Sequence, residues 1–144
     1  MPYTATNGTC PDPLPEPVEP FPTAMVNVPA NSSLELLLAV AKGPVAVAVA
    51  AHQFVFQFYG GGILNSTVCG TQLGHGITVV GYGQVASGAY YYIVRNSWGP
   101  TWGTAGYINI AAVDGEGICG IQMDASYADY SYVEPPTPPP VVIA

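Results

Sequence analysis

Two residues of this chain could together form a site for proton transfer. They are His75 in "GHGITVVGYG" and Asn96 in "YYIVRNSWG". An imidazole exchanges protons near neutral pH, and a hydrogen bond from one ring nitrogen fixes its tautomer and orientation. An asparagine oxygen can accept that bond without adding charge, whereas an aspartate would favour the imidazolium cation more strongly. We interpret the pair as a candidate acid–base site. A structural histidine beside glycines is the alternative that spacing alone leaves open.

Two tryptophans follow Asn96 closely, in "NSWGPTWG". An indole at Trp98 could shield a His75–Asn96 hydrogen bond from water, which would strengthen the bond in a lower local dielectric. Core packing between tight glycine turns is the competing interpretation of Trp98 and Trp102.

Three predicted strands would have to position these side chains. They are "HGITVVGYG" (75–83), "AYYYIVRN" (89–96) and "GYINIA" (106–111). Glycine-rich turn signals separate them, which favours an antiparallel β-meander. A hairpin would bring the start of the first strand beside the end of the second, and so His75 beside Asn96.

The residues before this meander predict a helix and a strand. In the helix, expected over 32–42, Ser32 and Glu35 form a capping box, and Gly43-Pro44 ends the helix. The alternation in "VAVAVAA" (45–51) predicts a strand packed on both faces. We expect a turn of helix and then a loop over 52–64.

Proline-rich segments lie at both ends of the chain. Residues 11–29 are expected to be extended, with little helix or ladder pairing. The tail, "VEPPTPPPVVIA", is typical of a stiff linker or a frayed end. We therefore expect a proline-rich connection (1–30), a β-rich unit (31–133) and a proline-rich tail or linker (134–144).

Composition limits the classes of partner. The chain has 144 residues, a net charge of −7 and only two basic residues, Lys42 and Arg95. Phosphate binding needs clustered cations, so nucleic acids and anionic membranes are poor partners. The sequence has no apolar run of about 18 residues, as a membrane-spanning helix would need.

We expect neither a cofactor nor a metal ion. His52 has no cysteine or histidine partner at the spacing of zinc ligands. Asp114 and Glu116, in "VDGEG", are followed by too few oxygen ligands for a calcium loop.

The sequence has features that are typical of extracellular proteins, but it has no visible signal peptide. The chain contains three cysteines and three Asn-x-Ser/Thr sequons, at Asn7, Asn31 and Asn65. An odd cysteine count in a secretory context leaves one cysteine without an internal partner. We interpret the chain as part of something longer.

The motifs "GHGITVVGYG", "YYIVRNSWGPTWGTAGYINI" and "GICGI", in this order, resemble the papain-like cysteine peptidases, of the papain and cathepsin L type. The composite motif spans His75 to Ile121, and weaker similarity extends from Pro2 to Tyr127. The resemblance implies an α+β fold, specifically the C-terminal antiparallel β-barrel-like domain of the papain-like fold. It also implies hydrolysis of peptide bonds in a polypeptide substrate.

The same resemblance assigns roles to residues. His75 would be the general base and acid, Asn96 would orient it, and Trp98 would cover their bond. Trp102 would belong to the aromatic wall on the leaving-group side. The family's nucleophile is a cysteine preceded by an oxyanion-hole glutamine, and no Gln-x₅-Cys-Trp segment occurs in this sequence. The expectation is that a missing N-terminal half carries the nucleophile and that this chain alone is inactive.

Disulfides and the main specificity pocket also follow from the resemblance. Cys69 would pair with Cys119, and Cys10 would pair with a cysteine in the missing half; a free Cys10 thiol is the alternative. The pocket would be lined by apolar or absent side chains, Ala48, Leu73 and Gly74, with Asp124 at its floor. Asp124 could then pair with a substrate arginine, although an exposed acid on a loop is an equally good interpretation.

A non-catalytic homologue is the main competing function. Such a chain would be a binding or decoy module, and cystatin-type inhibitors are possible partners of either form. Retention of both His75 and Asn96 favours the enzyme. Family, disulfide and sequons together predict a secreted or lysosomal/vacuolar protein.

Overall fold

The computed structural model describes residues 7–9 and 22–130. Its strands are β1 (Ala24–Asn27), β2 (Val45–Val49), β3 (Ile63–Leu64), β4 (His75–Gln84), β5 (Tyr90–Arg95), β6 (Tyr107–Ala111) and β7 (Ala125–Asp129). The helices are α1 (Ser33–Val40) and α2 (Phe54–Gln57), with 3₁₀ turns η1 (Thr67–Cys69) and η2 (Ile118–Gly120). No helix in this described part is long and apolar enough to cross a membrane.

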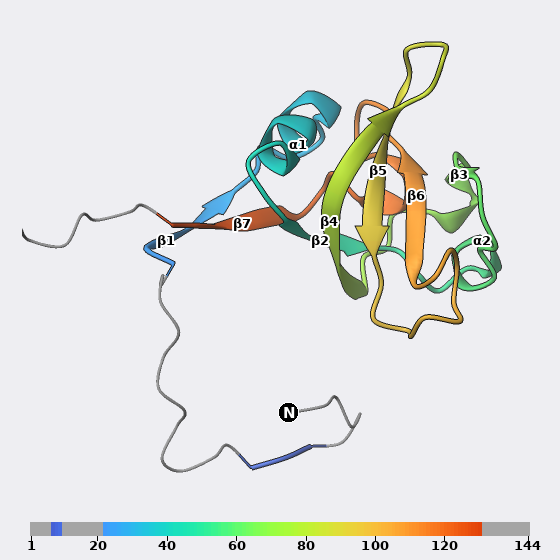
Figure 1. Ribbon diagram of the computed structural model, residues 1–144, viewed down its shortest axis with the longest axis horizontal. Coiled ribbons are helices and arrows are strands. Elements are labelled where there is room, and N and C mark those ends of the chain that lie inside the picture. Colours follow the sequence, from blue (N-terminus) through green and yellow to red (C-terminus); the bar gives the residue numbers. More distant parts are fainter. Residues whose placement is uncertain (1–6, 10–21, 131–144) are drawn as a thin grey trace, which may run out of the picture.

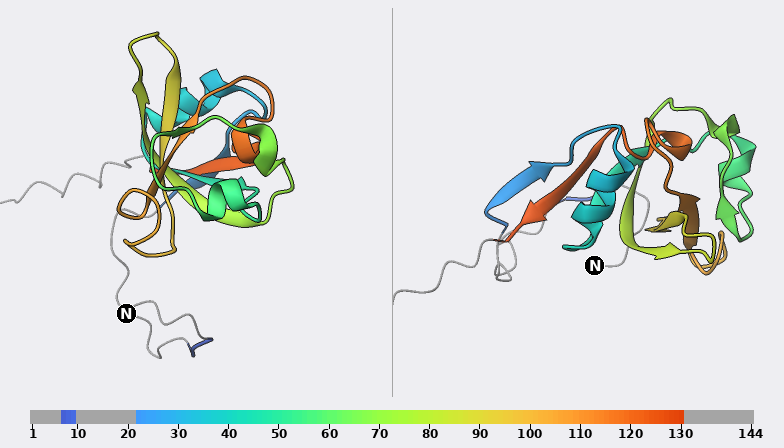
Figure 2. Two further views of the ribbon diagram at one scale, coloured as in Figure 1. Left: turned by 90° about the vertical axis from the view of Figure 1, so that its right-hand side faces the viewer. Right: turned by 90° about the horizontal axis from the view of Figure 1, so that it is seen from above.

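All of these strands belong to one curved sheet with the order β1-β7-β2-β4-β5-β6-β3 (Figures 1 and 2). The predicted meander is confirmed, because β4 pairs antiparallel with β5 and β5 pairs antiparallel with β6. The α+β class is confirmed as well. The sheet order ends at β1 and β3, and no ladder joins these two strands among the described residues. Closure of the expected barrel is therefore not shown.

The predicted helix is present as α1, somewhat shorter than the expected 32–42. Ser32 is its N-cap, and the Ser32 hydroxyl accepts a hydrogen bond from the backbone N–H of Glu35 at 3.3 Å. This bond satisfies one of the free N–H groups at the helix start. Leu36, Ala39 and Val40 are buried, so α1 packs its apolar side against the sheet.

The expectation of little ladder pairing in 11–29 is wrong for β1. Its residues pair with β7 in the register Ala24↔Asp129 to Asn27↔Ser126. The stretch between Pro22 and Pro29 contains no proline, so its N–H groups are free to join a ladder. Residues 11–21 lie outside the described part. The expected loop before Asn65 is also interrupted, because β3 pairs in parallel with β6.

The strand β2 is packed on one face, and the expectation of two packed faces is wrong. Val45, Val47 and Val49 are buried, whereas Ala46 is exposed and Ala48 is half-buried. The three valines point into the core, as strand alternation requires. The alanines between them lie on the outer face.

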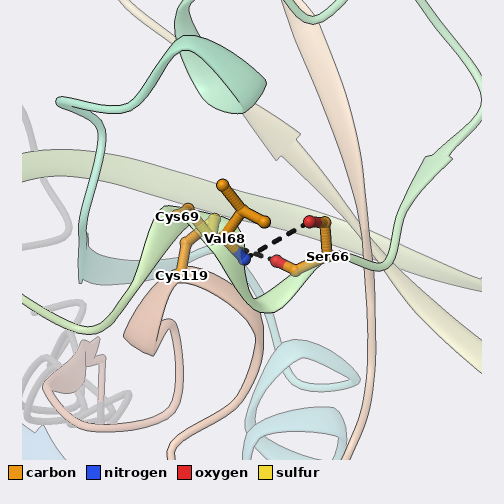
Figure 3. Close-up of a disulfide and its surroundings, with 4 residues drawn as sticks. All are labelled: Ser66, Val68, Cys69 and Cys119. Carbon is orange, nitrogen blue, oxygen red and sulfur yellow. Dashed lines mark hydrogen bonds between the residues drawn. A yellow bond between two sulfur atoms is a disulfide. The ribbon is translucent and has the colours of Figure 1, made fainter.

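The predicted disulfide between Cys69 and Cys119 is confirmed (Figure 3). It joins η1 to η2 with a Cα–Cα distance of 5.1 Å, and both cysteines are buried. Cys10 lies outside the described residues.

A buried polar network links β5 to α1 and to Gln122, which lies between η2 and β7. The hydroxyl of Tyr92 lies 3.1 Å from Oε1 of Gln122 and 3.2 Å from the carbonyl oxygen of Ser33. Gln122 Nε2 donates to the carbonyl oxygen of Gly115 at 2.7 Å, which fixes the orientation of the amide. Burial, and then the nearby charge of Asp114, raise the pKa of Tyr92 above its ordinary range.

This raised pKa predicts a loss of stability at alkaline pH. At a pH well below the ordinary tyrosine pKa of about 10, Tyr92 is neutral in both the folded and the unfolded chain. As the pH rises further, the unfolded chain ionises while the folded chain resists, so the free energy of unfolding falls. Urea unfolding at about pH 8 and pH 11 measures this fall, which should be smaller in Tyr92→Phe. The exposed Tyr82→Phe is the matched control, and an equal effect of both variants would contradict the prediction.

Candidate active site

The structure brings His75 and Asn96 together at one edge of the core. His75 is the first residue of β4, and Asn96 directly follows β5, its antiparallel neighbour. His75 Nε2 lies 2.9 Å from Asn96 Oδ1. The hairpin predicted from the sequence therefore produces the predicted contact.

A second hydrogen bond fixes which way the Asn96 amide faces. The backbone N–H of Ser97 donates to Asn96 Oδ1 at 2.8 Å, and a backbone N–H can only donate. The atom facing His75 is therefore an oxygen, so Nε2 must carry the proton that it donates. His75 Nδ1 then keeps its lone pair when the ring is neutral. No described residue hydrogen-bonds to Nδ1, so this nitrogen is available to a reacting group.

Asn96 is held in a largely dry environment. The residue is 7% exposed. Its Nδ2 is buried and has no hydrogen-bond partner among the described residues. The hydrogen bond to His75 is therefore made where water competes weakly, which strengthens it.

Both tryptophans lie at this site. The Trp98 ring stacks on His75 with a centroid distance of 5.0 Å and is itself 40% exposed, so it covers one face of the imidazole. The indole N–H of Trp102 donates to the carbonyl oxygen of Gln57 at 2.8 Å. Trp102 also meets Trp98 edge-on at 5.3 Å. Trp102 thus links the site to α2.

Phe56 is the residue at this site that sequence analysis missed. It is fully buried, and its ring lies 6.4 Å from His75, 5.6 Å from Trp98 and 5.4 Å from Trp102. The sequence has phenylalanine at 54, 56 and 58, and nothing in that pattern indicates which ring points inward. One turn of helix puts Phe54 and Phe58 on one side and Phe56 on the other. The exposure of Phe54 and Phe58 agrees with that division.

The residues predicted to form the specificity pocket lie around β2. The backbone N–H of Ala48 donates to the carbonyl oxygen of Asp124 at 3.0 Å, and that of Gly74 donates to Val49 at 3.1 Å. Asp124 therefore lies beside Ala48. Gly74 lies beside the end of β2, where Val49 pairs with His75. The Asp124 side chain is exposed. No ion pair or side-chain hydrogen bond to it is formed by the described residues.

Leu73, the remaining residue of the predicted pocket, directly precedes Gly74 in the chain. A Cβ added to Gly120 would come within 2.8 Å of Leu73 Cδ2, so the leucine packs closely over that glycine. Gly120 also has φ +72°, a backbone conformation that favours glycine. The positive φ and the close leucine therefore both require a residue without a side chain at this position. Packing on η2 fixes the chain just before Gly74 and His75.

Two hollows open beside Asn96, each of about 320 Å³. Both are bordered by Arg95, Asn96 and Ser97, and one continues along Gly76 and Thr78. Within residues 7–9 and 22–130, no three histidine, cysteine or acidic side chains are gathered so as to hold a metal ion.

Comparisons with known proteins match the chain to one family. A sequence model described as "Papain family cysteine protease" matches residues 1–129. The cysteine endopeptidase Rep1 of Oryza sativa is 48% identical over 135 residues, which are 88% of this chain and 34% of the relative. Vignain of Ricinus communis is 46% identical over 132 residues, which are 88% of this chain and 35% of the relative. The chain therefore spans about a third of the length of these curated relatives.

Solved structures give the same match. The bromelain protease of Ananas comosus, in complex with the E64 inhibitor, aligns with a TM-score of 0.81 at 42% identity. That alignment covers 90% of this chain and 60% of the bromelain chain. The proform of the ragweed pollen cysteine protease Amb a 11 aligns with a TM-score of 0.83 at 36% identity, over 93% of this chain and 41% of the other.

Proposed function

The chain belongs to the papain family of cysteine proteases, and we propose that it is the C-terminal part of a cysteine endopeptidase. His75 is the general base and acid of this enzyme, and Asn96 is the residue that orients it. The observation that carries the proposal is the 2.9 Å contact between His75 Nε2 and Asn96 Oδ1. The Ser97 N–H fixes the polarity of this contact and leaves Nδ1 free to take a proton.

The proposed mechanism uses this free nitrogen twice. His75 Nδ1 takes the proton of a cysteine thiol, and the thiolate attacks the carbonyl carbon of the scissile peptide bond. The imidazolium then gives that proton to the departing amine, which leaves an acyl-enzyme thioester. In the second half, Nδ1 takes a proton from water as the water attacks the thioester, and then returns it to the leaving thiolate. Asn96 holds the ring through both halves.

The nucleophile is proposed to come from a preceding part of a longer protein, together with the oxyanion-hole glutamine. Cys69 and Cys119 are joined in a disulfide, so neither can supply a thiolate. Cys10, outside the described residues, is followed by prolines at almost every second position, and this density is unsuited to the body of a helix that would carry the cysteine at its N-terminus. Catalytic residues that act together lose most of their rate acceleration when the nucleophile is missing. We therefore expect no turnover from this chain alone.

A chimaera tests the proposal. The part of Ricinus communis vignain that precedes the matched region is fused in front of this chain, which is 46% identical to the part it replaces. We expect the chimaera to hydrolyse peptide substrates and an active-site epoxide of the E64 type to block it. Replacing the nucleophilic cysteine of the vignain part with serine is the control for contaminating protease. A folded chimaera that binds cystatin-type inhibitors without turnover would instead support a decoy module.

The proposed substrate is a polypeptide, and cystatin-type inhibitors are the proposed regulatory partners. We also propose a compartment outside the cytosol, secreted or lysosomal/vacuolar. The buried disulfide supports this location, because such bonds persist where the environment is oxidising.

Asp124 is proposed to select arginine two residues before the scissile bond. In the chimaera, Asp124→Asn should lower kcat/KM for arginine relative to leucine at that position by about 10- to 150-fold, because a charge-assisted hydrogen bond contributes about 1.5–3 kcal/mol. Two peptides that differ only at this residue provide the measurement. Asp129→Asn, an equal charge change at the exposed end of β7, is the control. An unchanged arginine preference in Asp124→Asn would refute the role.

A further inference from the structure

The sequon Asn65-Ser66-Thr67 directly follows β3, and its last residue is the first residue of η1. Leu64, the last residue of β3, is buried, so strand alternation turns Ile63 and Asn65 toward the opposite, solvent side. Ser66 then caps η1, since its hydroxyl accepts a hydrogen bond from the backbone N–H of Val68 at 3.3 Å (Figure 3). Asn65 and Thr67 are both exposed, and neither side chain hydrogen-bonds to a described residue.

Exposed apolar side chains flank this asparagine in the chain. Ile63, two residues before it, is 39% exposed, and Val68, three residues after it, is 67% exposed. The disulfide of the neighbouring Cys69 ties this segment to η2 (Figure 3), which holds the exposed Val68 in place. Two exposed phenylalanines lie on the adjacent α2, which contacts η1. Exposed apolar patches promote binding or aggregation, and a bulky hydrophilic group on the same loop would mask these side chains.

We propose that Asn65 carries an N-linked glycan and that this glycan covers Ile63 and Val68. The two observations are independent: the sequon supplies the attachment site, and the exposed isoleucine and valine supply the surface to be covered. A branched oligosaccharide is hydrophilic and bulky, so it suits an exposed loop and not a packed core. The inference concerns a surface other than the His75 site and does not depend on the proposed catalysis.

The reaction is transfer of an oligosaccharide from a lipid-linked diphosphate donor to the Asn65 side chain. A bond forms between Asn65 Nδ2 and the anomeric carbon of the first sugar, and the bond between that carbon and the diphosphate oxygen breaks. The amide nitrogen loses one proton to a base of the transferase, and the lipid diphosphate leaves with the bonding electrons. The third residue of the sequon must be serine or threonine, which makes Thr67 the position for testing.

Secretion of the full chain from a eukaryotic host tests the attachment. We expect glycopeptide mass spectrometry to find a glycan on Asn65 in the natural chain and in Thr67→Ser, which keeps the sequon. The glycan mass should be lost from this peptide in Thr67→Ala, which retains Asn65. Asn31→Gln removes a different sequon and should leave the Asn65 glycan in place. An unmodified Asn65 in the secreted natural chain would overturn the proposal.

The covering role needs a second measurement on the same proteins. Secreted Thr67→Ala should bind more of a fluorescent apolar-surface dye than secreted Thr67→Ser, because Ile63 and Val68 are no longer covered. Val68→Ser in the Thr67→Ala background should reduce the excess. Bacterial preparations of both Thr67 variants, refolded with the Cys69–Cys119 disulfide, lack the glycan and should bind the dye equally. Equal dye binding by the two secreted variants would refute the covering role even if Asn65 is glycosylated.

Discussion

Replacing His75 with alanine in the vignain chimaera is expected to lower kcat/KM by about 10⁴-fold. The variant removes the group that accepts the thiol proton and later protonates the leaving amine, and nothing else described at the site can titrate in its place. Steady-state hydrolysis of a peptide substrate measures the effect. The loss should appear in kcat, because proton transfer belongs to the chemical step and not to substrate binding.

The second histidine provides the matched control. His52 is exposed, and the hydrogen bond that it accepts from Gln57 Nε2 uses its backbone carbonyl oxygen, which an alanine keeps. His52→Ala should therefore leave kcat/KM unchanged. Asn96→Ala should give an intermediate loss, of about 10–100-fold, as expected for a residue that orients another. Equal activity of the His75→Ala and His52→Ala chimaeras, both folded, would rule out the proposed mechanism.

Phe56→Ala is expected to lower the free energy of unfolding of the chimaera by about 3–5 kcal/mol. Phe56 is 0% exposed and lies among His75, Trp98 and Trp102, so its loss leaves a cavity at the centre of the cluster. The rings around that cavity can relax into it, which would shift the imidazole away from Asn96. We therefore expect kcat to fall as well. Urea unfolding measures the stability term, with the midpoint compared at constant slope.

Phe58→Ala separates this effect from a general sensitivity of α2. Phe58 is the same residue type, caps the C-terminal end of the same helix and is 79% exposed. Its removal should change the free energy of unfolding by no more than about 0.5 kcal/mol and leave kcat unaffected. If the two variants destabilise the chimaera equally, Phe56 is not the centre of the cluster.

The sequence by itself determined the features that depend on local pattern. Alternation and glycine turns predicted β4, β5 and β6, and the Ser32 cap with its Leu/Ala-rich continuation predicted α1. The hairpin between β4 and β5 follows from one turn, so the meeting of His75 and Asn96 could be predicted as well. The order of the motifs predicted the family, and the family predicted the Cys69–Cys119 disulfide.

Only the tertiary structure decided the features that depend on partners distant in the chain. The strand β1 exists because β7, about a hundred residues later, offers it a ladder. The inward direction of Phe56, among three phenylalanines, was set by the indoles that it meets across the fold. Ala46, on the outer face of β2, is exposed because none of the described elements packs over it. Local pattern records which surfaces of a segment are apolar, but burial is a contact between two surfaces, and the second is known only once the chain has folded.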